Sequence, residues 1–325
     1  MKEHTMPDNT QPTRKISIVG AGNVGATFAY ALLLSGLCSE IILIDQDSMK
    51  AEGEVMDLNH AVPLAHPTRI RVGDYRDCAS SAITVITAGT AQRPGETRLD
   101  LVKRNAAIFQ KIIPQVVKNN PDGILLITTN PVDILSHISM KLSGLPDHKV
   151  LGSGTILDTA RFRYLLGQHF NLDARSVHAF IIGEHGDSEV PVWSLANIAG
   201  MPIEQYCRAN GCDCNETTRN DIYLQTRNAA YQIIERKGAT YYAIASGLVR
   251  IVESILRDQH TILSVSTHIK GLYDIKDVFL SLPCVINRNG IDRIIQLPLD
   301  QSEISALQQS AKALKDVMHS IDLTN

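Results

Sequence analysis

One short stretch near the N-terminus limits what this chain can fold into: KISIVG at residues 15–20 runs directly into GAGNVG at 20–25. The first part is apolar and β-branched, as in a buried strand, and the helix-forming segment ATFAYALLLSGL follows the glycines. In a strand–turn–helix unit, Gly20 permits the tight turn, Gly22 leaves room for a pyrophosphate, and Gly25 lets the helix pack close to the sheet. The free N–H groups at the start of such a helix favour an anion. The stretch therefore predicts a dinucleotide-binding turn.

An acidic residue stands where this kind of turn needs one. Asp45 ends the next predicted strand, EIILID at 40–45. A carboxylate there can accept hydrogen bonds from both hydroxyls of an adenine ribose, and it repels a 2′-phosphate. The alternative role for Asp45 is that of a helix N-cap. Together with the glycine turn, whose Asn23 and Val24 are expected to contact the dinucleotide, Asp45 favours NAD over NADP as the cofactor.

Strands and helices alternate through the first half of the chain. AITVITAG at 82–89 and GILLITTN at 123–130 are further strand candidates, and the helical pattern LDLVKRNAAIFQKIIPQVVKN separates them. Repeated strand–helix–strand units imply right-handed crossovers and a parallel sheet that is covered on both faces. We therefore expect an α/β fold, with a doubly wound Rossmann NAD-binding domain over 15–150 and a disordered polar lead-in at 1–14.

The pattern changes after residue 150. A helical stretch at 219–238 mixes with two strand candidates, TILSVSTHI and DVFLSLPCVINRNGIDRII. The NRNG turn between apolar runs is a hairpin signal. The segment SEISALQQSAKALKDVMHSI has apolar residues at helical spacing and predicts a long amphipathic helix. A mixed α+β substrate domain is therefore expected over 151–325.

Composition excludes several classes of function. The net charge is −3, and lysine and arginine are scattered, which argues against binding to nucleic acid or to an anionic membrane surface. The apolar runs are too short to cross a bilayer. Six cysteines in 325 residues are too few for a disulfide framework, so we expect a cytoplasmic protein. Cys207, Cys212 and Cys214 cluster without a second ligand pair, so we interpret them as surface thiols and expect no metal.

Arg98 is a cation near the predicted start of a helix, an electrostatically unfavourable position. It lies in TAQRPGETRLDLV at 90–102, which leaves a strand and enters a helix. The dipole at a helix start disfavours a cation, so Arg98 is expected to meet a partner that moves onto it, such as a substrate. The alternative is an exposed arginine on a solvated loop.

A second pair of charges lies in GTILDTARFRYLLG at 154–167. Asp158 and Arg161 are three residues apart, so on a helix they share a face, whereas Arg163 points elsewhere. The alternative is a surface ion pair that contributes about 0.5 kcal/mol. The apolar neighbours favour burial, and a buried arginine is suited to binding a carboxylate with two hydrogen bonds.

His185 lies between glycines and acids in IIGEHGDSEV at 181–190, and taken alone it is typical of a solvated turn. An NAD site changes that interpretation, because the oxygen that becomes a hydroxyl during hydride transfer needs a proton. A histidine can supply this proton, and Asp158 can stabilise its imidazolium. Arg98 is then available to polarise the carbonyl group, and Arg161 to hold the acid group of the substrate.

Five motifs, taken in order and spacing, resemble the L-lactate and malate dehydrogenases from about residue 15 to the C-terminus: GAGNVG, AGTAQRPGETRLDLVKRN, TTNPVDIL, GSGTILDTARFR and IIGEHGDSEVPVWS. The resemblance implies that His185 is the proton donor and acceptor, with Asp158 as its partner. It implies that Arg98 polarises the carbonyl from a closing loop and that Arg161 binds the carboxylate.

The resemblance also implies a role for Asn130, which would contact substrate and nicotinamide. The alternative for Asn130 is an ordinary turn residue before Pro131. L stereochemistry and a homotetramer are likewise implied by the resemblance, since the residues alone support only association of some kind.

One loop position separates the branches of this superfamily. Gln92 lies six residues before Arg98, where malate dehydrogenases resemble one another in having arginine. A neutral amide would leave the second carboxylate of oxaloacetate unpaired in a closed, dry pocket, at a cost of several kcal/mol. Thr240 matches the position that borders the substrate's methyl group. We therefore expect an NAD-dependent L-lactate dehydrogenase of fermentative metabolism that interconverts pyruvate and L-lactate.

Two other functions stay open at this point. One is a malate or 2-hydroxyisocaproate dehydrogenase of the same superfamily. The other is an NAD-binding protein that has lost catalysis and has a structural role.

A further implication concerns regulation. Bacterial lactate dehydrogenases of this type can be activated by fructose 1,6-bisphosphate at a subunit interface, and their phosphate-binding arginine and histidine match Arg163 and His178. Two cations that meet across a symmetry axis repel each other until a bisphosphate bridges them. The alternative is that Arg163 is a helix-surface charge and His178 an ordinary strand residue.

Overall fold

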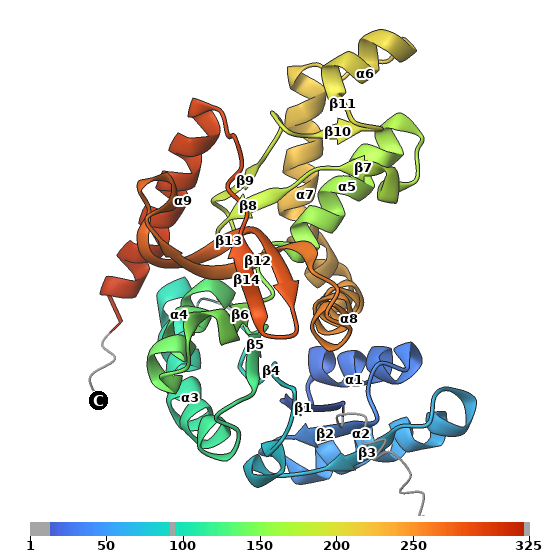
Figure 1. Ribbon diagram of the computed structural model, residues 1–325, viewed down its shortest axis with the longest axis vertical. Helices are drawn as coiled ribbons and strands as arrows, with labels where there is room; N and C mark the ends of the chain where they lie inside the picture. The colour runs from blue at the N-terminus through green and yellow to red at the C-terminus, as the bar shows by residue number, and fades with distance from the viewer. Residues whose placement is uncertain (1–13, 92–94, 96, 322–325) are drawn as a thin grey trace, which may run out of the picture.

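Six parallel strands form the sheet of the N-terminal half in the computed structural model, which describes residues 14–91, 95 and 97–321 (Figure 1). In spatial order the strands are β3 (Arg69–Val72), β2 (Glu40–Ile44), β1 (Lys15–Val19), β4 (Ile83–Ile86), β5 (Ile124–Ile127) and β6 (Val150–Gly152). The chain reverses its direction of winding between β1 and β4. In an open α/β sheet, the crevice at the carboxyl ends of such neighbours is where a nucleotide binds. This confirms the predicted Rossmann sheet; the sequence patterns had not indicated β3 or β6.

Helices cover both faces of this sheet, which is why its strands are almost entirely apolar. They are α1 (Asn23–Ser35), α2 (Ser48–Ala61), α3 (Arg98–Asn119) and α4 (Val132–Ser143). Successive residues of one strand point to opposite faces. Ile41 of β2 therefore packs in the same core cluster as Phe28 of α1, whereas Ile42 packs with Phe109 of α3.

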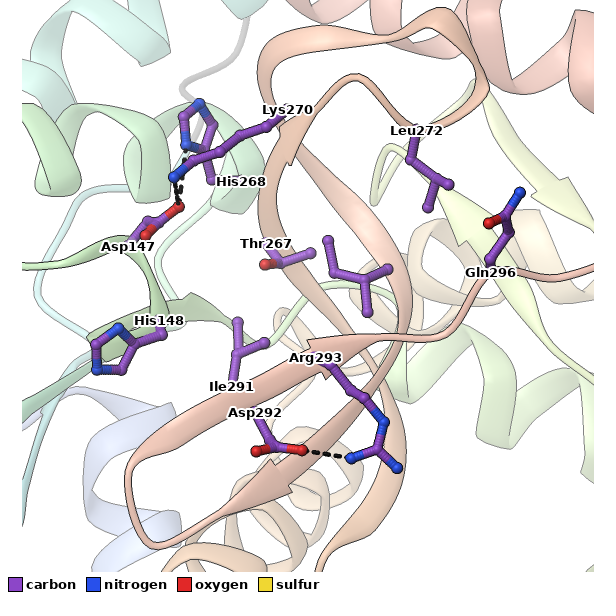
Figure 2. Close-up of a pocket in the computed structure, with 11 residues that line it drawn as sticks. Asp147, His148, Thr267, His268, Lys270, Leu272, Ile291, Asp292, Arg293 and Gln296 are labelled. Atoms are coloured by element: carbon purple, nitrogen blue, oxygen red, sulfur yellow. Dashed lines mark hydrogen bonds and ion pairs between the residues drawn. The ribbon is translucent and has the colours of Figure 1, made fainter.

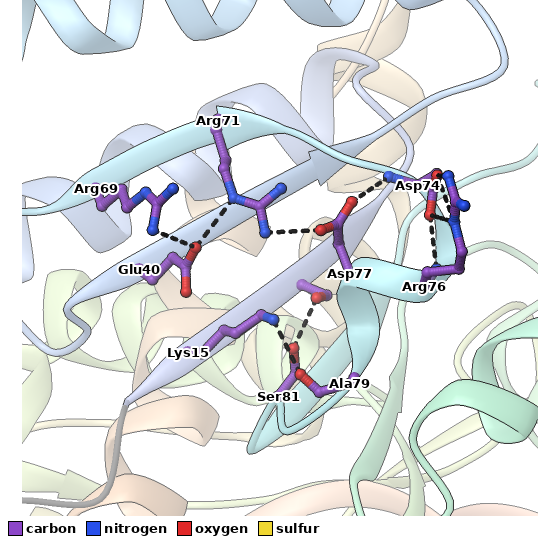
Figure 3. Close-up of polar contacts among 10 residues, drawn as sticks. Lys15, Glu40, Arg69, Arg71, Asp74, Arg76, Asp77, Ala79 and Ser81 are labelled. Carbon is purple, nitrogen blue, oxygen red and sulfur yellow. Dashed lines mark hydrogen bonds and ion pairs between the residues drawn. The ribbon is translucent and has the colours of Figure 1, made fainter.

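The exposed edge of the sheet is held by ion pairs (Figure 3). Arg71 of the edge strand β3 donates from Nε to Oε1 of Glu40 at 3.1 Å and from Nη2 to Oδ1 of Asp77 at 2.8 Å. Oδ2 of Asp77 accepts a further hydrogen bond from the backbone nitrogen of Asp74 at 2.8 Å. One arginine thus joins the edge strand to its neighbour β2 and to the turn that follows.

The sheet continues into the second half of the chain without a break. β6 pairs with β12 (Thr261–Lys270) in antiparallel fashion, and the remaining strands follow as β13 (Lys276–Asn287), β8 (Ile181–Gly183) and β9 (Glu189–Pro191), with β14 (Gly290–Ile294) also on β13. A separate three-stranded sheet contains β7 (Val177–His178), β10 (Asn197–Ile198) and β11 (Met201–Pro202). The predicted hairpin is confirmed, because Asn287 pairs with Gly290 across the NRNG turn.

The helices of the second half are α5 (Ile156–Phe170), α6 (Ile203–Asn210), α7 (Glu216–Lys237), α8 (Tyr242–Leu256) and α9 (Gln301–His319). The short 3₁₀ turns are η1 (Val62–Leu64), η2 (Tyr75–Cys78), η3 (Asp147–Lys149), η4 (Ala174–Ser176) and η5 (Leu272–Asp274). α9 confirms the predicted amphipathic helix and begins with a capping box between Asp300 and Glu303. α8 lies against α1, and this contact joins the two halves on one face of the sheet (Figure 1).

The interpretation of the cysteine cluster as surface thiols is wrong. Cys207 and Cys214 are buried and Cys212 is half-buried; all three belong to the core that forms around Phe162 under α6. The apolar face of α6 packs against the core, and Cys207 lies on that face. The polar residues around the cluster gave no indication of this burial. Within the described residues, no group of three histidine, cysteine or acidic side chains is placed to hold a metal ion. No helix in that part of the chain has the length and apolar character needed to cross a membrane.

Candidate active site

Two glycines of the turn after β1, Gly20 and Gly25, are closely packed, whereas the third, Gly22, faces open space. Gly20 has φ +115°, and a Cβ there would lie 2.6 Å from the backbone nitrogen of Ala88. A Cβ on Gly25 would lie 1.9 Å from the oxygen of Gly20, so the start of α1 can approach the turn only with glycine here. A Cβ on Gly22, in contrast, would have no atom beyond its chain neighbours within 4 Å, and no side chain caps the helix that begins after it. The turn therefore offers both space and backbone donors to a phosphate.

Asp45 joins this turn to the end of β2. Its Oδ2 accepts a hydrogen bond from the backbone nitrogen of Ala21 at 2.6 Å, and its Oδ1 accepts one from Asp47 at 3.0 Å. The N-cap of α2 is Asp47, which accepts from the backbone nitrogen of Lys50, so Asp45 does not have the capping role considered as its alternative. Its carboxylate stands at the edge of the crevice that the glycine turn lines.

Two more residues named from the sequence lie at the start of α1. Asn23 is its first residue and is exposed, whereas Val24 is half-buried against the core on that face of the sheet. Both backbones belong to the uncapped first turn of the helix. They are therefore next to the open position at Gly22.

A buried asparagine that sequence reasoning missed ties the neighbouring loops together. Asn105 of α3 accepts a hydrogen bond from the backbone nitrogen of Thr90 at 2.9 Å and donates one to the backbone oxygen of Asn130 at 2.8 Å. Asn105 thereby connects the loops that follow β4 and β5, and it leaves Asn130 itself exposed at the carboxyl end of β5. The available signal was an amide on the otherwise apolar face of an amphipathic helix.

The loop after β4 carries two residues expected in the site. Gln92 lies outside the described residues. The backbone of Arg98 begins α3, directly after Thr97, whose hydroxyl caps the helix together with Asp100. The capping box places Arg98 at the helix start, as the sequence predicted.

A buried carboxylate, Asp158 of α5, brings together two of the other residues named from the sequence. Its Oδ2 lies 2.5 Å from Nδ1 of His185, and its Oδ1 accepts a hydrogen bond from Nη1 of Arg161 at 2.9 Å. Asp158 is 2 % exposed, so the alternative of a surface ion pair does not apply. With Nδ1 engaged by the carboxylate, Nε2 is the ring nitrogen that remains for a substrate.

A second carboxylate, which sequence reasoning missed, holds the backbone of the same histidine. Asp133, near the start of α4, accepts at Oδ2 from the backbone nitrogen of His185 at 2.7 Å and at Oδ1 from the hydroxyl of Ser266 at 2.6 Å. Asp133 is 2 % exposed. It lies within TTNPVDIL, and its charge in an apolar segment was the available signal. The site is thus assembled from both halves of the chain.

Electrostatics couple the histidine to its partner. Burial disfavours the ionised form of Asp158, but the charges of His185 and Arg161 outweigh it and lower the pKa of the carboxyl group. Burial likewise disfavours the imidazolium of His185, yet Asp158, with a smaller effect from Asp133, raises its pKa to about 9. The histidine is therefore protonated at neutral pH and able to act as an acid.

Three further residues named from the sequence take no part in the hydrogen bonds around Asp158 within the described part of the chain. Arg163 donates from Nε to the backbone oxygen of Ala179 at 2.9 Å and lies over the ring of Phe180, and burial lowers its pKa. His178 is exposed on β7 and directly precedes Ala179, the residue that Arg163 contacts. Thr240 is half-buried in the connection between α7 and α8.

A separate hollow lies elsewhere, between β12, β14 and the turn before β6 (Figure 2). It encloses about 440 Å³, and its charged residues pair with one another, as Lys270 does with Asp147 at 2.6 Å and Arg293 with Asp292 at 2.5 Å. None of the site residues predicted from the sequence lines it. The hollow is therefore separate from the cluster around Asp158.

Comparisons with known proteins bear on both halves of the chain. Residues 14–152 match the model of the lactate/malate dehydrogenase NAD binding domain, and residues 155–322 match that of the lactate/malate dehydrogenase alpha/beta C-terminal domain. An L-lactate dehydrogenase of Acetivibrio thermocellus is 54% identical over 317 residues, which is 97% of this chain and 100% of that protein.

Solved structures are similar over almost the whole chain. A lactate dehydrogenase from a Medee basin deep-sea metagenome library superposes with a TM-score of 0.91 at 44% identity, covering 95% of this chain and 99% of its own. The minor L-lactate dehydrogenase of Enterococcus mundtii gives a TM-score of 0.93 at 40% identity, covering 96% and 100%.

Proposed function

The chain belongs to the lactate/malate dehydrogenase family and has the activity of an NAD-dependent L-lactate dehydrogenase, and we propose that His185 is its general acid and base. The reaction is (S)-lactate + NAD⁺ = pyruvate + NADH + H⁺. The observation that carries the proposal is the buried contact of 2.5 Å between His185 Nδ1 and Asp158 Oδ2, because it leaves the other ring nitrogen for a substrate and stabilises the imidazolium.

The residues around the glycine turn fit NAD. The open space at Gly22, the uncapped start of α1 and the carboxylate of Asp45 suit a pyrophosphate and an adenine ribose. We assign cofactor contacts to these groups, to the backbones of Asn23 and Val24, and to Asn130 at the end of β5. When NADH is bound there, it supplies the hydride that reduces C2 of pyruvate.

The chain's own residues then manage the proton and the charge. Protonated His185 donates its Nε2 proton to the carbonyl oxygen as that oxygen gains negative charge, and Asp158 stabilises the imidazolium before the transfer. In the opposite direction, neutral His185 accepts the proton of the lactate hydroxyl. Arg161, held in place by Asp158, binds the substrate carboxylate, and Arg98 polarises the carbonyl group.

Selectivity for pyruvate rests on residues that line the small end of the substrate. Gln92 lacks the positive charge that a second carboxylate needs, and Thr240 leaves space for a methyl group. The experiment that tests this assignment compares kcat/KM for pyruvate, oxaloacetate and 2-oxoisocaproate by NADH absorbance. Pyruvate should give the highest value; a higher value for either competitor contradicts the assignment.

We extend the proposal to regulation and assembly. Arg163 contacts Ala179, the neighbour of the exposed His178, and within the described residues the guanidinium of Arg163 forms no ion pair with a carboxylate. This pair suits one phosphate group of fructose 1,6-bisphosphate as an activator at a subunit interface.

Large apolar side chains are exposed on α1, α2 and α8, among them Leu34, Met56 and Tyr242, and such surfaces are typical of subunit contacts. They support the proposed homotetramer. The six cysteines are free thiols, which supports a cytoplasmic location.

A further inference from the structure

A buried carboxyl group near the proposed catalytic histidine has no part in the mechanism above. Glu189 begins β9, four residues after His185, and pairs with Gly183 of β8 in the hairpin that carries the histidine. The residue is 5 % exposed. Its backbone oxygen accepts a hydrogen bond from the hydroxyl of Tyr223 at 2.8 Å, which fixes β9 against α7. The side chain is therefore held inside the molecule.

The carboxyl group itself is poorly satisfied. Its Oε1 is buried and has no hydrogen-bond partner among the residues that the structure describes. An ionised carboxylate in this state is unfavourable, whereas the neutral acid loses much less on burial. An apolar side chain of similar size could fill this buried position without the cost of burying a carboxyl group. The presence of glutamate here therefore suggests a function for its carboxyl group.

The charged groups that act on Glu189 include three residues of the proposed substrate site, Asp158, Arg161 and His185. α5 contributes Asp158 and Arg161, the hairpin contributes His185, and α7 contributes Arg227. Burial raises the pKa of Glu189 and the negative charge of Asp158 raises it further, while the three cations oppose this shift; the result is a pKa of about 8.

The protonation of Glu189 therefore changes the net charge around Arg161. Asp158, protonated His185, Arg161 and Arg227 together carry a charge of +2 while Glu189 is neutral, and ionisation of Glu189 lowers the sum to +1. Ionisation therefore removes one unit of positive charge from the surroundings of Arg161. A substrate carboxylate is then attracted less strongly, in a pocket where screening by water is weak.

We propose that Glu189 is a positioning residue that sets the charge of the substrate site: as the neutral acid it permits tight binding of the substrate carboxylate at Arg161, and as the carboxylate it weakens that binding. The proposal rests on the function assigned above. It makes substrate affinity depend on pH through a group that takes no part in proton transfer to the substrate.

The test uses the full chain and the variants Glu189→Gln and Glu189→Met, which have similar volume and no charge. At pH 6, where Glu189 is neutral in the parent protein, KM for pyruvate should be unchanged within about twofold. At pH 10, KM for L-lactate should be about fivefold lower in both variants than in the parent, with kcat changed by no more than about twofold. The control variant Glu204→Gln removes an exposed carboxylate of α6 and should match the parent at both pH values.

The outcomes separate this inference from the assigned function. A parent protein that does not reduce pyruvate at pH 6 contradicts the function itself. A ratio of KM between variant and parent that is the same at pH 6 and pH 10 overturns the role of Glu189 alone. If neither variant folds, as judged by circular dichroism, the parent decides: KM for pyruvate should rise between pH 7 and pH 8.5, where Glu189 ionises and His185 is still largely protonated, and a constant KM over that range contradicts the proposal.

Discussion

The backbone nitrogen of His185 donates a hydrogen bond to Oδ2 of Asp133 at 2.7 Å, across 52 positions of the chain. Asp133 belongs to the helix after β5, and His185 to the hairpin at the far end of the same sheet. A second carboxylate, Asp158, holds the imidazole ring. The histidine is thus fixed at both its backbone and its ring. A group that takes part in proton transfer must be held in a defined position to reach a near-attack geometry.

Replacing His185 with Asn should remove the proton donor and leave the dinucleotide site intact. The expected loss in kcat for pyruvate reduction is on the order of 10³-fold, the usual contribution of general acid catalysis. NADH binding, followed by the change in its fluorescence, should stay within about twofold of the parent value, because no cofactor contact is removed. A variant with undiminished turnover would refute the assignment of His185.

Replacing Asp158 with Asn should move the pH profile of pyruvate reduction. Asp158 raises the pKa of His185 to about 9, so in the parent the protonated form persists up to that pH and the rate falls above it. Without the negative charge, burial dominates, the pKa of the imidazole falls, and the loss of rate should begin at lower pH. The measurement is kcat/KM for pyruvate between pH 5 and 10, and an unshifted profile counts against the pair.

Replacing Asp133 with Ala should lower both stability and rate. The substitution leaves the backbone nitrogen of His185 and the hydroxyl of Ser266 without their buried partner, at a cost of about 1–3 kcal/mol for each unsatisfied group. Urea unfolding measures this change in the free energy of unfolding. Ser266→Ala is the matched control, because it frees only one oxygen of Asp133 and should reduce kcat less than Asp133→Ala.

Replacing Gln92 with Arg should shift substrate preference toward oxaloacetate. The new guanidinium can pair with the second carboxylate, which Gln92 leaves unpaired. The ratio of kcat/KM for oxaloacetate to that for pyruvate should rise by at least about tenfold, which corresponds to about 1.4 kcal/mol. A ratio that does not move shows that another residue sets the selectivity.

Fructose 1,6-bisphosphate should lower KM for pyruvate, by about fivefold or more if the coupling is of ordinary size. Titration at low pyruvate, followed by NADH absorbance, measures this effect. Arg163→Gln removes a phosphate-binding charge and should abolish the response while leaving the rate without activator similar. A flat titration in the parent protein would end this part of the proposal.

Local spacing was sufficient for much of this protein. The strand, the glycine turn and the helix at residues 15–35 follow from side-chain size and backbone freedom over a few neighbouring positions, as the contact of Gly25 with Gly20 shows. The ion pair between Asp158 and Arg161 follows from the three-residue spacing on a helix. The hairpin at NRNG is equally local, because its turn residues determine the pairing on either side.

Only the tertiary structure decided which distant groups meet. Ser266 reaches Asp133, which holds His185, because β12 adds to the parallel sheet beside β6, and no spacing along the chain encodes that pairing. The same holds for Cys207, which was interpreted as a surface thiol, and for Glu189; packing buries both. Burial is a sum over contacts from many segments, so the charge of an acid or the reactivity of a thiol is settled only when the whole core has formed.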